Sequence, residues 1–318
     1  MKNKIICAAL AVLMLLSLVS CGVRVEKVHS KPSIVTTNFA MFDFARAVAG
    51  NCADVMMLLT PGNESHDFEA TLTDIAAISN ADLFVYVGGE SEDWVYDVFD
   101  SLYPAAPTDD LPLCTFCALD AVETYDEEIV EGMAPTDEEN EETAPDEHVW
   151  TSLTNAMSLV ASLADKLSEI DGDNAETYRA NADKYIAQLD AVKDDLTEVV
   201  TNAKRHTIVV ADRFPFRYLA EEFALEYYAA FSGCTSATEP PLSTVNFLTE
   251  KVKSENIPAI FVIEFSDGKT AKAVADECGC EILTLHSAHN VSLEDYRAGV
   301  TYADIMRRNL DALKIALK

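Results

Sequence analysis

Four of the six histidines lie in loops where an imidazole could bind a metal ion. His286 and His289 lie together in the segment TLHSAHNVS, directly after the strand-like run EILTL. His66 follows a Pro-Gly turn, and His148 lies where an acidic stretch ends and a helical block begins. Imidazole is the common neutral ligand of zinc, and sites rich in nitrogen suit zinc better than manganese or magnesium. Each histidine alone is most simply a solvated side chain, but the joint pattern indicates a divalent-metal site.

The elements that must position these histidines alternate between strand-like and helical patterns. IVTT, VMMLL, LFVYVG and LCTFCAL are typical of buried strands, with helical runs such as MFDFARAVAG between them. The second half repeats this texture with TIVVA, EYYAAF, AIFVIE and EILTL. Such alternation predicts parallel sheets with helices on both faces, and ligands bind such sheets at the carboxyl ends of the strands. His206, which precedes a strand on the far side, and His29 are expected to be structural or solvated.

A long helical block separates the two halves, and its second part after GDN has apolar residues at three- and four-residue steps. We therefore predict an α/β protein with two lobes, each a parallel-sheet α/β sandwich, joined by one long backbone helix. The expected organisation is a signal peptide and lipobox at 1–21, an N-terminal lobe at 22–173 with an acidic loop at 121–147, a linking helix at 174–204, and a C-terminal lobe at 205–318.

The N-terminus reads as an export signal. Lys2 and Lys4 precede an apolar run that is too short for a comfortable transmembrane helix and is typical of a signal peptide. The run ends at Ser20-Cys21, which resembles a bacterial lipobox. That resemblance implies lipidation of Cys21 and a protein anchored by lipid on the extracytoplasmic face of the cell membrane. An ordinary signal peptide with an incidental cysteine is the alternative.

The charge of the chain restricts its partners. It carries 23 basic and 54 acidic residues, a net charge of −31. This argues against a nucleic-acid partner, which would require lysine and arginine contacts to phosphate, and it favours cations. The segment 121–147 contains twelve acidic residues and no lysine or arginine. We expect a flexible loop there, either merely solvated or collecting cations near a cleft.

Six cysteines follow Cys21, and an even number in an exported protein permits disulfides. The CxxC at 114–117 and the CxC at 278–280 match neither a zinc ribbon nor a thioredoxin site. Buried thiols and disulfides both remain open, and no pairing can be read from the sequence.

Several ordered motifs resemble the solute-binding lipoproteins of metal ABC importers, the zinc and manganese cluster. The family's PG-x-x-x-H-x-F/Y segment appears with Pro61, His66 and Phe68, and its ADL strand begins at Ala81. Its further motifs are matched by Asp146, His148 and Trp150, and by Tyr302, Met306, Asn309 and Leu313. The resemblance covers nearly all of the mature chain.

The resemblance implies a metal-binding subunit that captures Zn²⁺ between its lobes and delivers it to a membrane permease with its ATPase. It implies His66 and His148 as first-lobe ligands, and His286 at the place of the last ligand, with His289 as a neighbour or alternative. At the family's third ligand position this chain has Arg213, which cannot ligate a metal. The site would then be three histidines with an open position.

Other residues could complete the expected site. Asp212, Glu264 or His289 could supply the missing ligand, and Arg213 could pair with a carboxylate such as Glu239 or Glu264. The rival functions are a manganese- or iron-binding homologue, a surface adhesin with incidental histidines, and a zinc hydrolase. Nothing resembling an HExxH helix or a nucleophile motif supports an enzyme.

Overall fold

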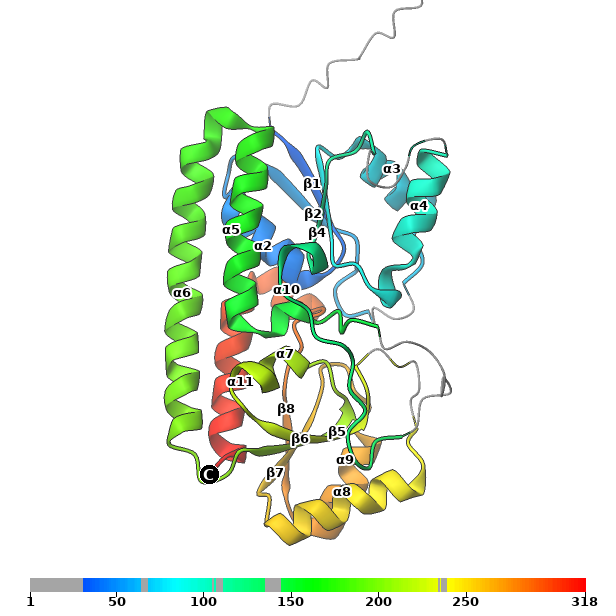
Figure 1. Ribbon diagram of the computed structural model, residues 1–318, viewed down its shortest axis with the longest axis vertical. Helices are drawn as coiled ribbons and strands as arrows, with labels where there is room; N and C mark the ends of the chain where they lie inside the picture. Colours follow the sequence, from blue (N-terminus) through cyan, green and yellow to red (C-terminus); the bar gives the residue numbers. More distant parts are fainter. Residues whose placement is uncertain are drawn as a thin grey trace, which may run out of the picture. The chain divides into compact units, whose positions relative to one another are not determined.

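Two four-stranded sheets, each made of parallel strands, lie along one long helix in the computed structural model (Figure 1). The structure describes residues 31–63, 68–104, 106, 111–134, 144–233, 235 and 239–318. They belong to one compact unit, Lys31–Lys318. The predicted signal peptide, Cys21 and His29 lie outside the described residues. None of the described helices is both long and apolar enough to cross a membrane.

The first sheet has the strand order β2-β1-β3-β4, and all its pairings are parallel. Its strands are β1 (Ser33–Thr36), β2 (Asp54–Met57), β3 (Leu83–Tyr86) and β4 (Thr115–Cys117). Alternate residues of β3 enter different cores. Leu83 and Val85 pack with α2 (Phe39–Ala49), whereas Phe84 and Tyr86 pack with the cluster that includes α3 (Leu72–Asn80) and α4 (Trp94–Leu102). Both faces are therefore covered, which explains why LFVY is apolar throughout.

The second sheet repeats this arrangement with the order β6-β5-β7-β8. Its strands are β5 (Thr207–Arg213), β6 (Glu226–Phe231), β7 (Ala259–Val262) and β8 (Glu281–Thr284). Ile208 and Val210 enter the large core shared with the first sheet, and Val209 packs in a separate cluster with two helices. The helices of this half are α7 (Arg217–Glu222), α8 (Leu242–Glu255), α9 (Lys269–Cys278), α10 (Leu293–Ala298) and α11 (Tyr302–Ala316).

The helix α6 (Ala175–Thr201) joins the two sheets and is 27 residues long. It follows α5 (Leu153–Ile170) after a short 3₁₀ turn at Gly172–Asn174. Its buried residues recur at three- and four-residue steps from Tyr178 to Val200, so one apolar stripe faces the core. Figure 1 shows α6 running past both sheets. The predicted fold class is confirmed, whereas the exact lobe boundaries remain a prediction.

Asp43, in α2, links that helix to α6 and α11 through hydrogen bonds of its side chain. Its carboxylate, 1% exposed, accepts hydrogen bonds from the Tyr302 backbone N–H at 2.8 Å, from the Arg46 Nε at 2.6 Å and from the Tyr185 hydroxyl. Burial raises the pKa of Asp43, and the bonded neighbours, Arg46 foremost, oppose that rise. The network ties α2 of the first lobe and α11 of the second to α6.

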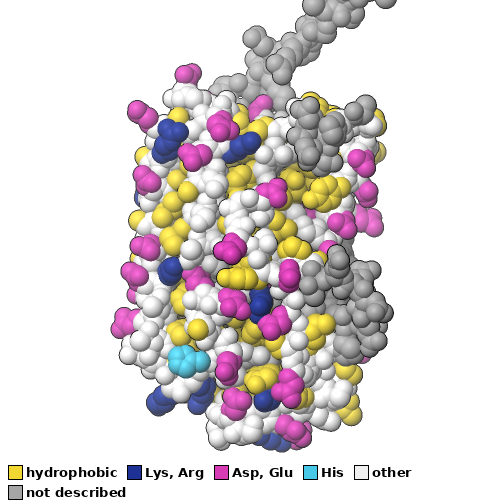
Figure 2. All heavy atoms as spheres, in the orientation of Figure 1, with side chains coloured by type: hydrophobic (Ala, Val, Ile, Leu, Met, Phe, Trp, Pro, Cys, Tyr) yellow, Lys and Arg dark blue, Asp and Glu magenta, His cyan; other side chains and the backbone are white. Residues whose placement is uncertain are grey.

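The two ends of the acidic loop pair with each other. Asp126 and Pro145 form an antiparallel bridge, and the Asp146 backbone N–H donates to the Tyr125 carbonyl at 2.8 Å. Residues 135–143, in the middle of the loop, lie outside the described residues. On the visible face in Figure 2, Asp and Glu side chains are widely scattered.

All five cysteines in the described part of the chain are free thiols. Cys114 and Cys117 lie at β4, and Cys278 ends α9. The structure thus favours free thiols over disulfides at these positions, and all five side chains are only partly buried. Cys234 lies outside the described residues.

Candidate metal centre

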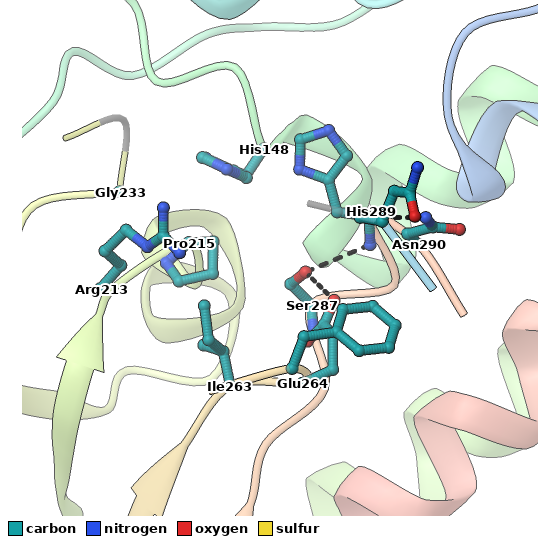
Figure 3. A pocket seen from close by; sticks show the side chains of 11 residues that line it. His148, Arg213, Pro215, Gly233, Ile263, Glu264, Ser287, His289 and Asn290 are labelled. Carbon is teal, nitrogen blue, oxygen red and sulfur yellow. Dashed lines mark hydrogen bonds between the residues drawn. The ribbon is translucent and has the colours of Figure 1, made fainter. Parts of the chain in front are cut away.

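A small cavity of about 30 Å³ lies where loops of both lobes meet (Figure 3). Four segments that follow β5, β6, β7 and β8 contribute to its wall, as expected for the carboxyl ends of parallel strands. The lining residues are Asn63, His148, Arg213, Pro215, Gly233, Ile263, Glu264, Phe265, Ser287, His289 and Asn290.

His148 is fixed in this cavity by Asp146. Its Nδ1 lies 3.0 Å from the Asp146 Oδ1, which also accepts the His148 backbone N–H at 2.8 Å. A carboxylate on Nδ1 sets the ring orientation and leaves Nε2 as the nitrogen for a metal ion. Burial lowers the pKa of His148, but Asp146 and Glu147 more than offset this, so the net pKa is raised.

Asp146 is itself positioned by Tyr218 from the second lobe. The Tyr218 hydroxyl donates to the Asp146 carbonyl at 2.6 Å and accepts the Tyr125 backbone N–H at 3.1 Å. Tyr218 is 1% exposed. The root of the acidic loop is therefore part of the support for His148.

Gly233 gives His148 the room it occupies. A Cβ atom at this position would lie 3.1 Å from the His148 Cε1 and 3.2 Å from its Nδ1. It would also meet the Phe214 carbonyl oxygen at 3.1 Å. Because these contacts are closer than ordinary van der Waals contact, a side chain here would displace the imidazole.

His289 faces His148 from the second lobe. The two ring centroids are 5.9 Å apart with an interplanar angle of 81°. Two imidazoles on one zinc ion, with Zn–N bonds near 2.1 Å, place their centroids about 5–6 Å apart. The His289 backbone N–H donates to the Ser287 Oγ at 3.1 Å, and its carbonyl accepts the Phe39 N–H at 2.9 Å. The spacing of the two rings agrees with one shared zinc ion, to which the described residues bring these two imidazoles.

His286 does not line the cavity, although the sequence placed it first among the second-lobe candidates. Its Nδ1 accepts the Ala288 backbone N–H at 2.9 Å and lies 3.4 Å from the Glu264 Oε2. The Asn309 side chain accepts a hydrogen bond from the His286 backbone N–H and donates one to the His286 carbonyl, both at 2.8 Å. Ala288 has a φ of 61°, and this turn separates the environments of His286 and His289. The structure thus brings together His148 and His289 and leaves His286 in the turn.

Of the two carboxylates expected as alternative ligands, only Glu264 lines the cavity, and Asp212 lies elsewhere. Glu264 lines the cavity, and its oxygens accept the Ser287 N–H at 2.7 Å and the Ser287 hydroxyl at 2.5 Å. Asp212 is not among the lining residues; it accepts the Arg213 backbone N–H at 2.9 Å and the Ser266 hydroxyl. Arg213 itself lines the cavity.

His66 lies outside the described residues, and Asn63, three positions earlier, lines the cavity. Within the part of the chain that the structure describes, no three His, Cys, Asp or Glu side chains cluster as metal ligands. Among the described residues, His148 and His289 are therefore the pair of candidate metal ligands that the cavity brings together.

Sequence reasoning missed Asn290, which connects the two lobes at this site. Its Nδ2 donates to the carbonyls of Thr60 and Asn63, both at 2.8 Å, and its Oδ1 accepts the Val291 N–H at 2.8 Å. It is 2% exposed. The only sequence signal was its position beside a loop histidine, which does not reveal a partner more than two hundred positions away.

Comparisons with known proteins match this architecture. The family described as "Zinc-uptake complex component A periplasmic" (ZnuA) matches residues 34–316. The chain is 33% identical over 306 residues to the zinc-binding lipoprotein AdcA of Streptococcus pneumoniae, covering 96% of this chain and 59% of AdcA. It is 30% identical over 301 residues to the high-affinity zinc uptake system protein ZnuA of Bacillus subtilis, covering 92% and 88% of the two chains.

A solved structure agrees in fold. The Zn(II)-bound ZnuA-like domain of Streptococcus pneumoniae AdcA aligns with a TM-score of 0.72 at 30% identity, covering 90% of this chain and 99% of that domain. The chain spans 56 to 59% of the length of its AdcA relatives. The matched family consists of transport components rather than enzymes, in agreement with the sequence expectation. The match across nearly the whole described chain shows that this protein belongs to the ZnuA family of metal-importer solute-binding proteins.

Proposed function

We propose that this protein captures Zn²⁺ in the cavity between its lobes and delivers it to an ABC permease driven by its ATPase. The observation that carries this proposal is the facing pair of imidazoles, His148 and His289, one from each lobe. A metal bound by both would join the lobes at a single point. The names of the AdcA and ZnuA relatives support zinc as the captured ion.

The ligand set that we propose is His66, His148 and His289. His66 enters from its sequence motif, and His289 replaces His286 because it lines the cavity. Three imidazoles and one open position suit zinc better than manganese, which prefers oxygen ligands. A lipid anchor at Cys21 would hold the protein near the permease, as the lipoprotein name of the pneumococcal relative supports.

The test is a zinc titration of the protein lacking residues 1–21, compared with His148→Ala, His289→Ala and His286→Ala. His286 is a matched control because it belongs to the same turn as His289 but does not line the cavity. One tight zinc site that is lost in the first two variants and kept in His286→Ala supports the proposal. Stoichiometric zinc binding by His148→Ala and His289→Ala would contradict it.

Thermal unfolding of each variant in chelator separates loss of ligand from loss of fold. The variants at His148 and His289 should lose the zinc-induced rise in melting temperature, since a ligand that binds only the folded state stabilises it by mass action. The His286→Ala variant should retain that rise even if its metal-free melting temperature falls.

A further inference from the structure

A second cavity adjoins the candidate metal centre at His289, which lines both cavities. Among the described residues, His148 lines the first cavity but not the second. The volume of the second cavity is about 20 Å³, which is enough for roughly one water molecule. Whatever the second cavity holds therefore lies next to one candidate ligand and apart from the other.

Asn38 brings a hydrogen-bond donor to the second cavity. It is the N-cap residue of α2, and its Oδ1 accepts the Met41 backbone N–H at 3.0 Å. Because this bond identifies the oxygen, the other end of the amide is the Nδ2 donor. Asn38 is 1% exposed, and its Nδ2 finds no hydrogen-bond partner among the described residues. A buried N–H without an acceptor is costly, so this nitrogen points to a ligand that accepts a hydrogen bond.

Glu92 brings an acceptor to the same cavity and is 6% exposed. Its Oε2 accepts the backbone N–H of Val87 at 2.7 Å and that of Gly88 at 3.0 Å. These two bonds fix the carboxyl group at the cavity wall. The Ser91 hydroxyl, also in the wall, donates to Glu147. The wall thus presents the Asn38 donor and the Glu92 acceptor together.

This pair selects a small neutral molecule that both accepts and donates hydrogen bonds. An anion would face the acceptor oxygens of Glu92, and a metal cation would face the N–H group of Asn38. An apolar molecule would leave both polar groups unpaired. Leu59, Phe68 and Trp94 supply apolar wall, which limits the ligand to the size of the cavity without adding polar partners. Water meets these requirements of size and hydrogen bonding.

We propose that one internal water molecule occupies the second cavity, bonded to the Asn38 Nδ2 and the Glu92 carboxyl group, and that it positions His289 for zinc. The residue after Asn38 is Phe39, whose backbone N–H donates to the His289 carbonyl at 2.9 Å. The start of α2 therefore holds both the water and the His289 backbone. Partners that orient a metal-binding imidazole typically contribute roughly 10- to 100-fold to metal affinity. The positioning role rests on the zinc-capture function proposed above, whereas the water site does not.

A high-resolution crystal structure of the metal-free protein lacking residues 1–21 tests the water site. We expect one water oxygen within about 3.2 Å of both the Asn38 Nδ2 and a Glu92 carboxyl oxygen. A dry cavity, or a direct hydrogen bond between the two side chains, would overturn the proposal.

Asn38→Ser separates the water from the helix cap. Serine is an equally good N-cap, so α2 keeps its first side-chain hydrogen bond while the amide that holds the water is lost. Zinc affinity, measured by competition with a chromophoric chelator, should fall about tenfold. Asn202→Ser is the matched control, because Asn202 is exposed and its Nδ2 donates to the Glu198 carbonyl at the end of α6. This control should bind zinc like the wild-type protein.

Cobalt in place of zinc supplies a readout that a mere loss of stability would not move. The visible spectrum of cobalt-saturated Asn38→Ser should differ from that of the wild-type protein, because the His289 imidazole has shifted. Wild-type zinc affinity or an unchanged cobalt spectrum in Asn38→Ser would overturn the positioning role. No zinc binding by the wild-type protein would overturn the proposed function and the positioning role with it, while the water site would still be decided by the crystal structure.

Discussion

The indole Nε1 of Trp150 donates a hydrogen bond to the backbone carbonyl of Ser287 at 2.8 Å. Both residues are buried, and they belong to the segments that carry His148 and His289. The Trp150 ring also lies 5.4 Å from the His148 ring and 5.2 Å from the His289 ring, centroid to centroid. One side chain thus contacts both imidazoles and joins the segments that bear them.

This position makes Trp150 a reporter of metal binding. The chain has two tryptophans, so Trp94→Phe leaves Trp150 as the only indole. Zinc should change the fluorescence of that variant, because the charge beside the ring changes when both imidazoles bind a cation. The Trp150→Phe variant, in which only Trp94 remains, is the control and should show little response. The reverse pattern would place the metal nearer to Trp94, which lines a second cavity together with His289, than to His148.

Trp150→Phe should also lower stability. It leaves the buried Ser287 carbonyl without its donor, which costs about 1–3 kcal/mol of unfolding free energy. Denaturant unfolding in chelator measures this change. An unchanged midpoint would mean that the carbonyl finds another donor.

Gly233→Ala should weaken zinc binding while leaving the fold nearly intact. The added methyl group would meet the His148 ring at 3.1 Å and force the imidazole to move. We expect a loss of about tenfold in zinc affinity, since small displacements of a ligand are costly in a preorganised site. Gly172→Ala is the matched control because a Cβ atom at Gly172 would meet nothing within 4 Å. Equal zinc affinity of the two variants would contradict the role assigned to Gly233.

The raised pKa of Glu92 predicts that the stability of the metal-free protein depends on pH. Burial raises the pKa of this carboxyl to about 7, while hydrogen bonds from Gly88 and Val87 oppose the rise. The folded state therefore binds a proton more tightly than the unfolded state. The contribution of Glu92 to stability should be greatest below the unfolded value of 4.5 and should fall, by up to about 3 kcal/mol, as pH rises to about 7.

Glu92→Gln isolates this contribution. A neutral amide keeps an acceptor for the two backbone donors and removes the titration, so the variant should lose stability less steeply between pH 4.5 and about 7. Chemical denaturation across this range in chelator is the measurement. Parallel curves for the wild-type protein and the variant would assign the slope to other groups, of which Glu147, also raised in pKa by burial, is the nearest candidate.

Asn290→Ala should weaken both the fold and the metal site. The change removes two 2.8 Å hydrogen bonds to the carbonyls of Thr60 and Asn63. We expect a loss of about 1–3 kcal/mol in the free energy of unfolding. Zinc affinity should fall with it, because the loop that leads to His66 loses its tie to His289. Differential scanning calorimetry and zinc titration check the two effects, and normal affinity in a destabilised variant would limit Asn290 to a role in stability.

The fold was largely predictable from the sequence, whereas the site was predictable only in part. Buried strands such as LFVY and the apolar stripe of α6 are local patterns, and local patterns determine the α/β class. The choice between His286 and His289 depends on a turn at Ala288, a non-glycine residue with positive φ. No sequence signature marks that turn, because its support comes from Asn309 and Glu264, both distant along the chain. His148 was found by its motif, but Gly233 and Tyr218 act on it from the other lobe.

Asn290 has a mechanical consequence for the way cargo could leave. The carbonyls of Thr60 and Asn63 accept hydrogen bonds from the side-chain amide of Asn290, the residue after His289. The carbonyl of His289 accepts a hydrogen bond from the backbone N–H of Phe39. A displacement of residues 60–63 is therefore transmitted through the Asn290 side chain to the neighbouring His289. Since α6 and the Asp43 network brace the lobes, a docking partner could unseat the ion by moving these loops, with no rotation of one sheet against the other.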